Sequence, residues 1–241
     1  MQSLDPTRGD PEGLAVAMAG VVLLFIVISS YGQWVLIGVL EEKSTRVVEL
    51  VAAAIPIRRL LAGKVLGIGL LGLAQMLLLV GIGLGAGLTL DVFDLPATAV
   101  ATAVWSIVWF LLGFALYAVI NAAAGSLVSR QEDAQAAAMP IGLTAVAVYL
   151  MTFMVIVPQA ESTAATVLSL LPPVAPIAFP ARIALGAAAP WEIALGVVLT
   201  LATVYGVILL AARVYAGALL QTGARIKWRQ AWRSARDVGS A

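Results

Sequence analysis

Five long stretches of the chain consist almost entirely of apolar residues and contain no Asp, Glu, Lys or Arg. They are Leu14–Leu40, Val65–Leu90, Leu95–Val128, Ala134–Val157 and Ile193–Ala212. A helix of about 20 apolar residues crosses the hydrocarbon core of a bilayer, and each stretch reaches that length. Lipid offers no hydrogen-bonding partner to the backbone, so a stretch inside the membrane must be helical. The pattern predicts an all-α, polytopic integral membrane protein with five transmembrane helices.

The composition agrees with a chain that lies mostly in lipid. Charged residues make up 11% of the sequence, compared with about 25% in soluble domains. Cysteine and histidine are both absent. Their absence excludes thiol and imidazole catalysis and every metal site built from Cys or His. We therefore expect no catalytic residue, no metal site and no cofactor in this chain.

The basic residues cluster in alternate connections between the apolar stretches. The segment 41–64 carries five Lys and Arg, the segment 129–133 carries one, and the chain from residue 213 onward carries six. The other connections and the first 13 residues carry only Arg8 and Arg182. Since cytoplasmic loops carry an excess of Lys and Arg, we expect a protein of the cell (inner) membrane with its N-terminus outside and its C-terminus in the cytoplasm.

A sixth apolar segment, 164–189, differs from the others because it contains four prolines within nine residues. Each proline removes a helical hydrogen-bond donor and clashes with the preceding turn. We therefore expect a re-entrant or interfacial element on the outer face, made of two short helices broken near Pro172–Pro176. Arg182 and Glu192 flank this element. They are close enough in the sequence to pair, but we favour two interfacial charges held independently.

The most informative polar segment is Glu41–Lys64, which reads EEKSTRVVELVAAAIPIRRLLAGK. Over residues 41–54, apolar side chains recur at helical spacing and form one stripe, and Pro56 then ends the predicted helix. The basic residues Arg58, Arg59 and Lys64 lead into the next span. Such an amphipathic helix either lies on anionic lipid or receives a protein partner, and its acidic start favours the partner.

The segment also resembles a family. The pattern of two acids, a lysine, a later Glu-Leu, a proline, a basic pair and Gly-Lys is similar to the cytoplasmic coupling segment of type-2 ABC exporter permeases, in particular the NatB-like sodium-efflux group. Two further stretches are similar to the same group, GSLVSRQEDAQ at 125–135 and LLPPVAPIAFPARIALG at 170–186. The three stretches occur in the family's order, on the sides that the charges predict.

The resemblance implies a half-transporter that pairs with a second permease half, as a homodimer or heterodimer, and docks on a separate cytoplasmic ATPase subunit. The family has six spans, and the five spans here correspond to its last five. Residues 1–13 would then be the end of an outer domain, 14–218 the permease domain and 219–241 a basic cytoplasmic tail. Within the permease domain, residues 41–62 form what we call the coupling segment.

The resemblance and the residue types together identify candidate site residues. For contact with the ATPase they are Glu41, Glu42, Lys43, Arg46, Glu49, Arg58 and Arg59. For the pathway and its outer gate they are Gln75, Asn121, Pro172, Pro173, Pro176 and Arg182. Neutral amides inside a membrane either mark a pathway or hydrogen-bond between helices, and both interpretations of Gln75 and Asn121 remain open.

Other function classes receive less support. The sequence Gly67–Gly72 matches a dinucleotide-binding pattern, but it lies inside an apolar span, whereas that fingerprint requires a preceding strand. No ATP site is visible, so ATP-driven transport requires a partner chain. The tail, with Trp228, Trp232 and five basic residues, is typical of a helix on the inner leaflet rather than of nucleic-acid binding.

The function we expect is therefore the membrane-spanning permease subunit of an ATP-driven ABC-type exporter, in contact with membrane lipids. The alternatives are a non-ABC multispan transporter or channel, and an intramembrane enzyme. The first has no charged residue in the middle of any span to support it, and the second has no paired carboxylates, Cys or His. The transported substrate is not specified by these residues.

Overall fold

A computed structural model describes residues 11–44, 57–89, 97–128 and 131–219. These residues form helices and no strand. The long helices are α1 (Pro11–Ser44), α3 (Ile57–Thr89), α4 (Ala97–Leu127), α5 (Gln131–Met151) and α8 (Pro190–Leu219). A π-helical turn, η1 (Thr152–Ile156), continues α5, and two short helices follow, α6 (Thr163–Ser169) and α7 (Ala175–Ala184).

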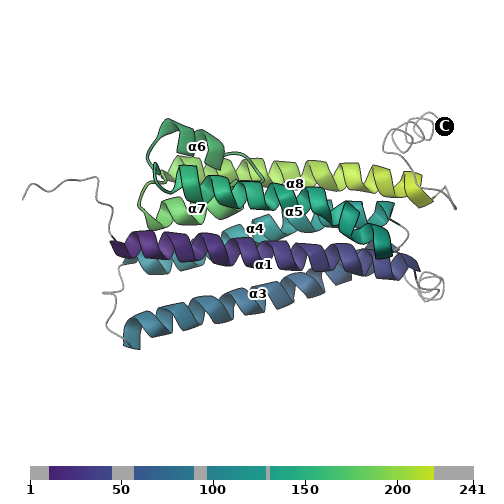
Figure 1. Ribbon diagram of the computed structural model, residues 1–241, viewed down its shortest axis with the longest axis horizontal. Coiled ribbons are helices and arrows are strands. Elements are labelled where there is room, and N and C mark those ends of the chain that lie inside the picture. The colour runs from purple at the N-terminus through teal and green to yellow at the C-terminus, as the bar shows by residue number, and fades with distance from the viewer. Residues whose placement is uncertain (1–10, 45–56, 90–96, 129–130, 220–241) are drawn as a thin grey trace, which may run out of the picture. The chain divides into compact units, whose positions relative to one another are not determined.

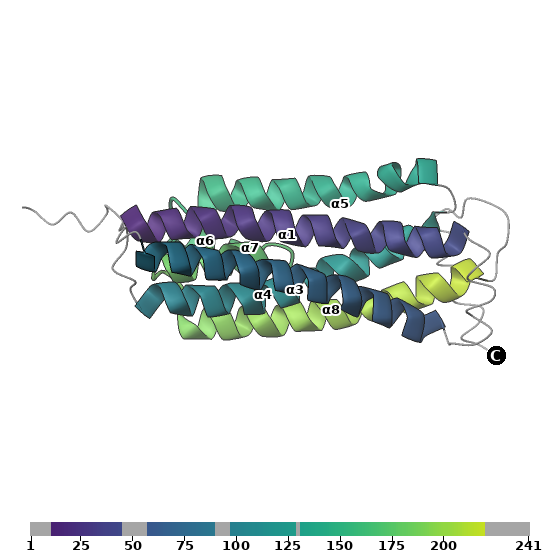
Figure 2. The ribbon, with the colours of Figure 1, turned by 90° about the horizontal axis from the view of Figure 1, so that it is seen from below.

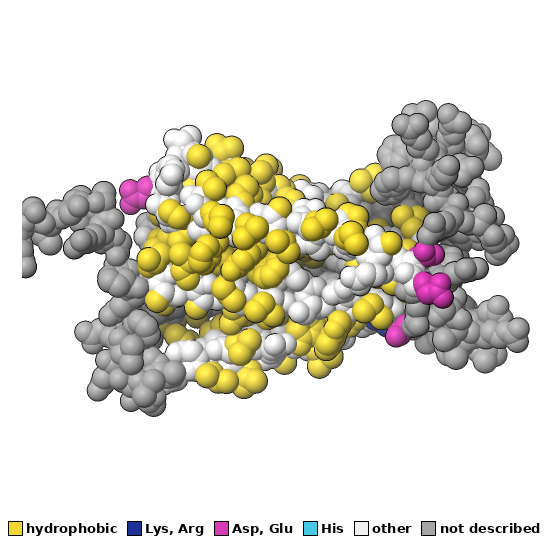
Figure 3. Space-filling view, in the orientation of Figure 1, with side chains coloured by type: hydrophobic (Ala, Val, Ile, Leu, Met, Phe, Trp, Pro, Cys, Tyr) yellow, Lys and Arg dark blue, Asp and Glu magenta, His cyan; other side chains and the backbone are white. Residues whose placement is uncertain are grey.

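Five helices in the described part of the chain are long and apolar enough to cross a membrane. Their apolar windows are Gly13–Glu41, Gly63–Gly85, Val100–Leu127, Glu132–Ile156 and Pro190–Leu210. The predicted five-span, all-α architecture is confirmed. On the face shown in Figure 3, hydrophobic side chains cover the helices and the acidic side chains in view lie near helix ends. A surface of this kind suits lipid rather than water.

The chain folds as two compact units, each built from interleaved segments. Unit 1 contains residues 1–28, 72–113 and 145–201, and unit 2 contains residues 29–71, 114–144 and 202–241. Each of the five long helices contributes one segment to each unit. Within each unit these segments run lengthwise in roughly the same direction (Figure 2).

The Pro-rich segment forms two short helices, as the prolines predict. We call α6 and α7 together the Pro-rich hairpin. The break between them lies at residues 170–174, which include Pro172 and Pro173. Helices α6 and α7 pack against each other and against η1, all within unit 1 (Figure 1).

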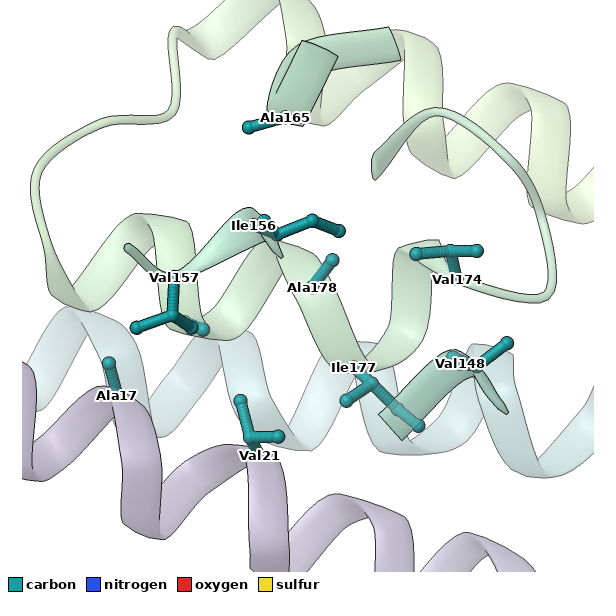
Figure 4. Packing of buried hydrophobic residues seen from close by; sticks show 10 residues of the cluster. Ala17, Val21, Val148, Ile156, Val157, Ala165, Val174, Ile177 and Ala178 are labelled. Carbon is teal, nitrogen blue, oxygen red and sulfur yellow. The ribbon is translucent and has the colours of Figure 1, made fainter. Parts of the chain in front are cut away.

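A cluster of buried apolar side chains holds the Pro-rich hairpin in unit 1. Figure 4 shows Ala17 and Val21 of α1 on one side of this cluster, and Val174 and Ile177 of the hairpin region on the other. Val148, Ile156 and Val157 join it from α5 and the residues that follow. The hairpin is therefore part of the packed core of unit 1 and not a loose loop.

One boundary differs from the sequence-based expectation. We expected the first span to end at Leu40 and a separate amphipathic helix to cover 41–54, but α1 continues without a break through Ser44. Glu and Lys are good helix formers, so charges show where a helix leaves the apolar layer rather than where it stops. Residues 45–56 lie outside the described part of the chain, and α3 begins at Ile57, directly after Pro56.

Candidate functional site

A buried ion pair ties the Pro-rich hairpin to the start of α8. Arg182 lies in the last turn of α7 and is only 1% exposed. Its Nη1 lies 2.7 Å from Oε2 of Glu192, in the first turn of α8. Our expectation that these two charges are held independently is therefore wrong. An exposed charge is stabilised by solvent, but a buried one requires a partner, and Glu192 is the acid that the fold brings within reach.

The other two nitrogens of Arg182 donate hydrogen bonds. Its Nε donates to the Ala160 carbonyl at 2.9 Å, and its Nη2 donates to Thr166 Oγ1 at 3.0 Å and to the Ala187 carbonyl at 2.8 Å. The Thr166 hydroxyl lies 3.5 Å from Oε1 of Glu192. A guanidinium that is held at all three of its nitrogens in this way joins four parts of unit 1 together.

The backbone at the end of α7 is shaped to supply one of these acceptors. The amide of Ala187 donates to the carbonyl of Arg182 at 2.8 Å, and the amide of Gly186 donates to the carbonyl of Ile183 at 3.0 Å. Gly186 has a φ of +67°. This is the Schellman arrangement that ends many helices, and it requires a residue that tolerates the left-handed region. It places the Ala187 carbonyl next to the Arg182 side chain.

The candidate gate prolines occupy two kinds of position. Pro172 and Pro173 are half-buried in the turn between the two short helices. Pro176 is buried in the first turn of α7, where a missing N–H costs nothing because that turn has no helical acceptor. A Cβ on Gly113 of α4 would lie 2.6 Å from Cβ of Pro176. The glycine thus allows α4 to approach the proline ring closely.

An aromatic stack supports the other side of the hairpin. Trp109 of α4 and Phe179 of α7 are fully buried, with their ring centroids 4.8 Å apart and their planes 8° from parallel. Gly196 of α8 faces the Phe179 ring so closely that a Cβ there would overlap it. Sequence analysis missed Trp109 and Gly196, which carry no signal that separates them from other residues of the apolar spans. It noted Glu192 but not its pairing with Arg182.

The two candidate pathway amides lie in different surroundings. Asn121 is buried in unit 2, where its Nδ2 donates to the Tyr117 carbonyl at 2.8 Å and where Gly32 of α1 packs against it. This arrangement favours a role in helix packing. Gln75 of α3 is exposed on the surface of the chain. Gln75 and Arg182 belong to unit 1, and Asn121 belongs to unit 2.

The candidate coupling residues are only partly described. Glu41 is exposed in the last turn of α1. Glu42 and Lys43 belong to α1, and Arg58 and Arg59 to the first turn of α3, but their side chains lie outside the described part, as do Arg46 and Glu49 entirely. Lys64, for which a lipid-surface anchor was one of two open interpretations, donates to the Gly38 carbonyl of α1 at 2.6 Å.

The sequence of the chain is similar to a known family of membrane proteins. A family model described as "ABC-2 family transporter protein" matches residues 2–213. An uncharacterized protein, YhaP of Bacillus subtilis (strain 168), is 30% identical over 155 residues. That alignment covers 59% of this chain and 36% of the relative, so the chain matches about a third of the relative's length. No solved structure matches the chain significantly.

Proposed function

Because the chain belongs to the ABC-2 family of transporter proteins, we propose that it is the permease of an ATP-driven exporter and that a separate ATPase subunit energises it. The family supplies the membrane component of an ABC transporter. The observation that carries the proposal is that the family match includes all five helices able to cross a membrane. The alternative, a non-ABC multispan transporter or channel, has no comparable observation in its favour.

We place the ATPase contact on the coupling segment, residues 41–62. Glu41, Glu42 and Lys43 lie in the last turn of α1, and Arg58 and Arg59 lie in the first turn of α3, so the segment joins two spanning helices. Arg46 and Glu49 lie between them in the sequence. A partner that binds there has access to both helices, which is what conversion of ATP hydrolysis into motion of the spans requires.

We assign the outer gate to the Pro-rich hairpin. Its two helices are too short to cross a bilayer, and Arg182 ties them to α8. A movement of the start of α8 would therefore be transmitted through Arg182 to the hairpin and would displace Pro172, Pro173 and Pro176. The role of Gln75 and Asn121 as pathway residues stays a prediction, as does the division of the chain into 1–13, 14–218 and 219–241.

A second permease half is also part of the proposal, and α3 supports it. Only 11% of the apolar window of α3 is buried, whereas 44% of that of α4 is buried. A Cβ at Gly67, Gly81 or Gly83 of α3 would meet nothing within 4 Å in the described part of the chain. Small residues favour close contact between membrane helices. The second half, identical or not, and lipid are the two occupants we expect for this surface.

The decisive experiment is co-purification of the chain with an ATPase, followed by charge reversal in the coupling segment. We expect Glu49→Lys to release the ATPase, because an interface charge left without its partner costs about 2–5 kcal/mol of binding. The matched control is Glu161→Lys, at an exposed acid just before the Pro-rich hairpin, which we expect to keep the ATPase bound. If Glu49→Lys binds the ATPase as well as the control does, the coupling role is wrong and the segment is a lipid anchor.

A further inference from the structure

A lysine near the start of α3 is directed toward α1 rather than toward the lipid headgroups. Nζ of Lys64 donates to the carbonyl of Gly38 at 2.6 Å, across 26 residues of sequence and within unit 2. The side chain is partly buried. A lysine near the end of a spanning helix can reach the interface by extending its flexible stem. Here the ammonium group contacts backbone of the neighbouring helix.

The absence of a side chain at Gly38 makes this contact possible. A Cβ on Gly38 would lie 3.0 Å from both Cδ and Cε of Lys64 and 3.1 Å from Nζ. Any larger residue would force the lysine stem to shift. Glycine at position 38 therefore gives the stem room to lie against the α1 backbone, so Gly38 and Lys64 act as a matched pair.

The pair lies on either side of the coupling segment. Gly38 precedes residue 41 by less than one helical turn, and Lys64 follows residue 62 closely. The hydrogen bond therefore joins the two helices at the points where the segment leaves one and enters the other.

Helix α1 is also held to α4 within the same unit. A Cβ on Gly125 of α4 would lie 2.7 Å from the Leu36 carbonyl, and a Cβ on Gly32 of α1 would lie 3.1 Å from Nδ2 of Asn121. Backbones that approach so closely move together, so a displacement of α1 also displaces α4. For α3 to move with them when the coupling segment is displaced, α3 must be attached to α1 as well.

We propose that Lys64 is a positioning residue for ATP coupling, which fastens α3 to α1 through the Gly38 carbonyl at the two ends of the coupling segment. This inference rests on the proposed function. The lysine touches neither ATP nor cargo. It makes the two helices respond together when the ATPase moves the segment between them.

The test uses the full chain with the ATPase that co-purifies with it, and needs no knowledge of the cargo. For each variant, three quantities are measured: ATPase capture, the thermal stability of the permease in detergent, and the increase in Mg-ATP hydrolysis that the permease causes. The variants are Lys64→Met, which keeps the stem but removes the ammonium, Lys64→Arg, Gly38→Ala and the double variant G38A/K64M. Gly63→Ala is the matched control, because a Cβ there meets nothing within 4 Å.

We expect Lys64→Met to lower the stimulated hydrolysis about tenfold, the factor to which the loss of one charged hydrogen bond corresponds, with capture close to wild type and a melting temperature lower by only about 2–4 °C. Lys64→Arg keeps a cationic donor and should retain the stimulation, and Gly38→Ala should lose part of it. The double variant should be no worse than Lys64→Met, because both changes act on one contact. Gly63→Ala should behave as wild type.

Two results overturn the inference while the proposed function stands. One is a Lys64→Met permease that stimulates hydrolysis as well as wild type. The other is parallel loss of capture, stability and stimulation, which would make Lys64 a purely structural residue. If the wild-type chain captures no ATPase or leaves its hydrolysis unchanged, the proposed function itself fails and the coupling role of Lys64 fails with it.

Discussion

At the scale of single residues, Arg182 is the charge on which the Pro-rich hairpin depends. It is buried, and its side chain contacts four groups from four parts of unit 1. Arg182→Met would leave the Glu192 carboxylate buried beside the Thr166 hydroxyl, without its cationic partner. Removing one partner of a buried pair typically costs about 3–5 kcal/mol. We expect a loss of that size in the free energy of unfolding, measured by denaturation of the purified protein in detergent.

The double variant R182M/E192L separates the pair from the packing around it. Replacement of a buried ion pair by apolar residues is often close to neutral, so we expect the double variant to be more stable than Arg182→Met alone. Glu161→Gln, at an exposed acid of the same unit, should change stability by less than about 0.5 kcal/mol. An Arg182→Met protein as stable as wild type would mean that the ion pair contributes nothing to the fold.

Glycine positions give a second residue-scale prediction, because the structure distinguishes crowded glycines from open ones. A Cβ on Gly125 would lie 2.7 Å from the Leu36 carbonyl oxygen, and a backbone atom cannot swing away as a side chain does. We expect Gly125→Ala to cost about 1–3 kcal/mol, the usual range for overpacking. Gly142→Ala in α5, where a Cβ meets nothing within 4 Å, should be neutral or slightly stabilising. Thermal unfolding of the two variants side by side makes the comparison.

At the scale of elements, the end of α7 decides where the Ala187 carbonyl meets Arg182. Gly186 holds a φ of +67°, which costs a residue with a side chain about 1–2 kcal/mol. Gly186→Val should therefore destabilise the protein by roughly that amount, and Gly186→Asn by less, because asparagine tolerates the left-handed region. Thermal melts of both variants check the order. Equal stability of the two would show that the turn adopts another conformation without loss.

The elements differ in how far the sequence predicts them. The five spans follow from runs of apolar residues because lipid leaves the backbone no alternative to helix. The break between α6 and α7 follows from the prolines for a similarly local reason. The end of α1 at Ser44 was not predicted, because the acids and lysine after Leu40 are compatible with helix.

The contacts of the candidate site were harder to predict because they join residues far apart in the sequence. Nothing in the sequence says that Lys64 meets a carbonyl 26 residues earlier, since a glycine and a backbone oxygen leave no distinctive pattern. Arg182 and Glu192 were visible as charges, but their pairing depends on how α7 and α8 pack. Trp109 and Gly196 look like any other residues of apolar spans in the sequence. Only the structure shows that both lie against the ring of Phe179.

At the scale of the whole molecule, the remaining prediction concerns which side of the membrane each connection faces. The basic residues lie almost entirely in the segments 41–64, 129–133 and 213–241, and the positive-inside rule places those segments in the cytoplasm. The chain has no cysteine, so single cysteines at Ser44, Glu161 and Gln230 can be labelled one at a time. Glu161 is preferred to its neighbour Ser162, because the Ser162 hydroxyl caps α6 and its loss would cost about 1 kcal/mol.

In intact cells, we expect an impermeant maleimide to label the cysteine at position 161 and to leave those at 44 and 230 unlabelled. All three should react once the membrane is permeabilised, which controls for burial. An odd number of spans requires the ends of the permease domain to lie on opposite sides, and an even number would bring them to the same side. Labelling at 230 with 44 protected would mean that the Pro-rich hairpin crosses the membrane. Labelling at 44 and 230 with 161 protected would mean that the whole molecule is inverted and that the coupling segment cannot meet a cytoplasmic ATPase.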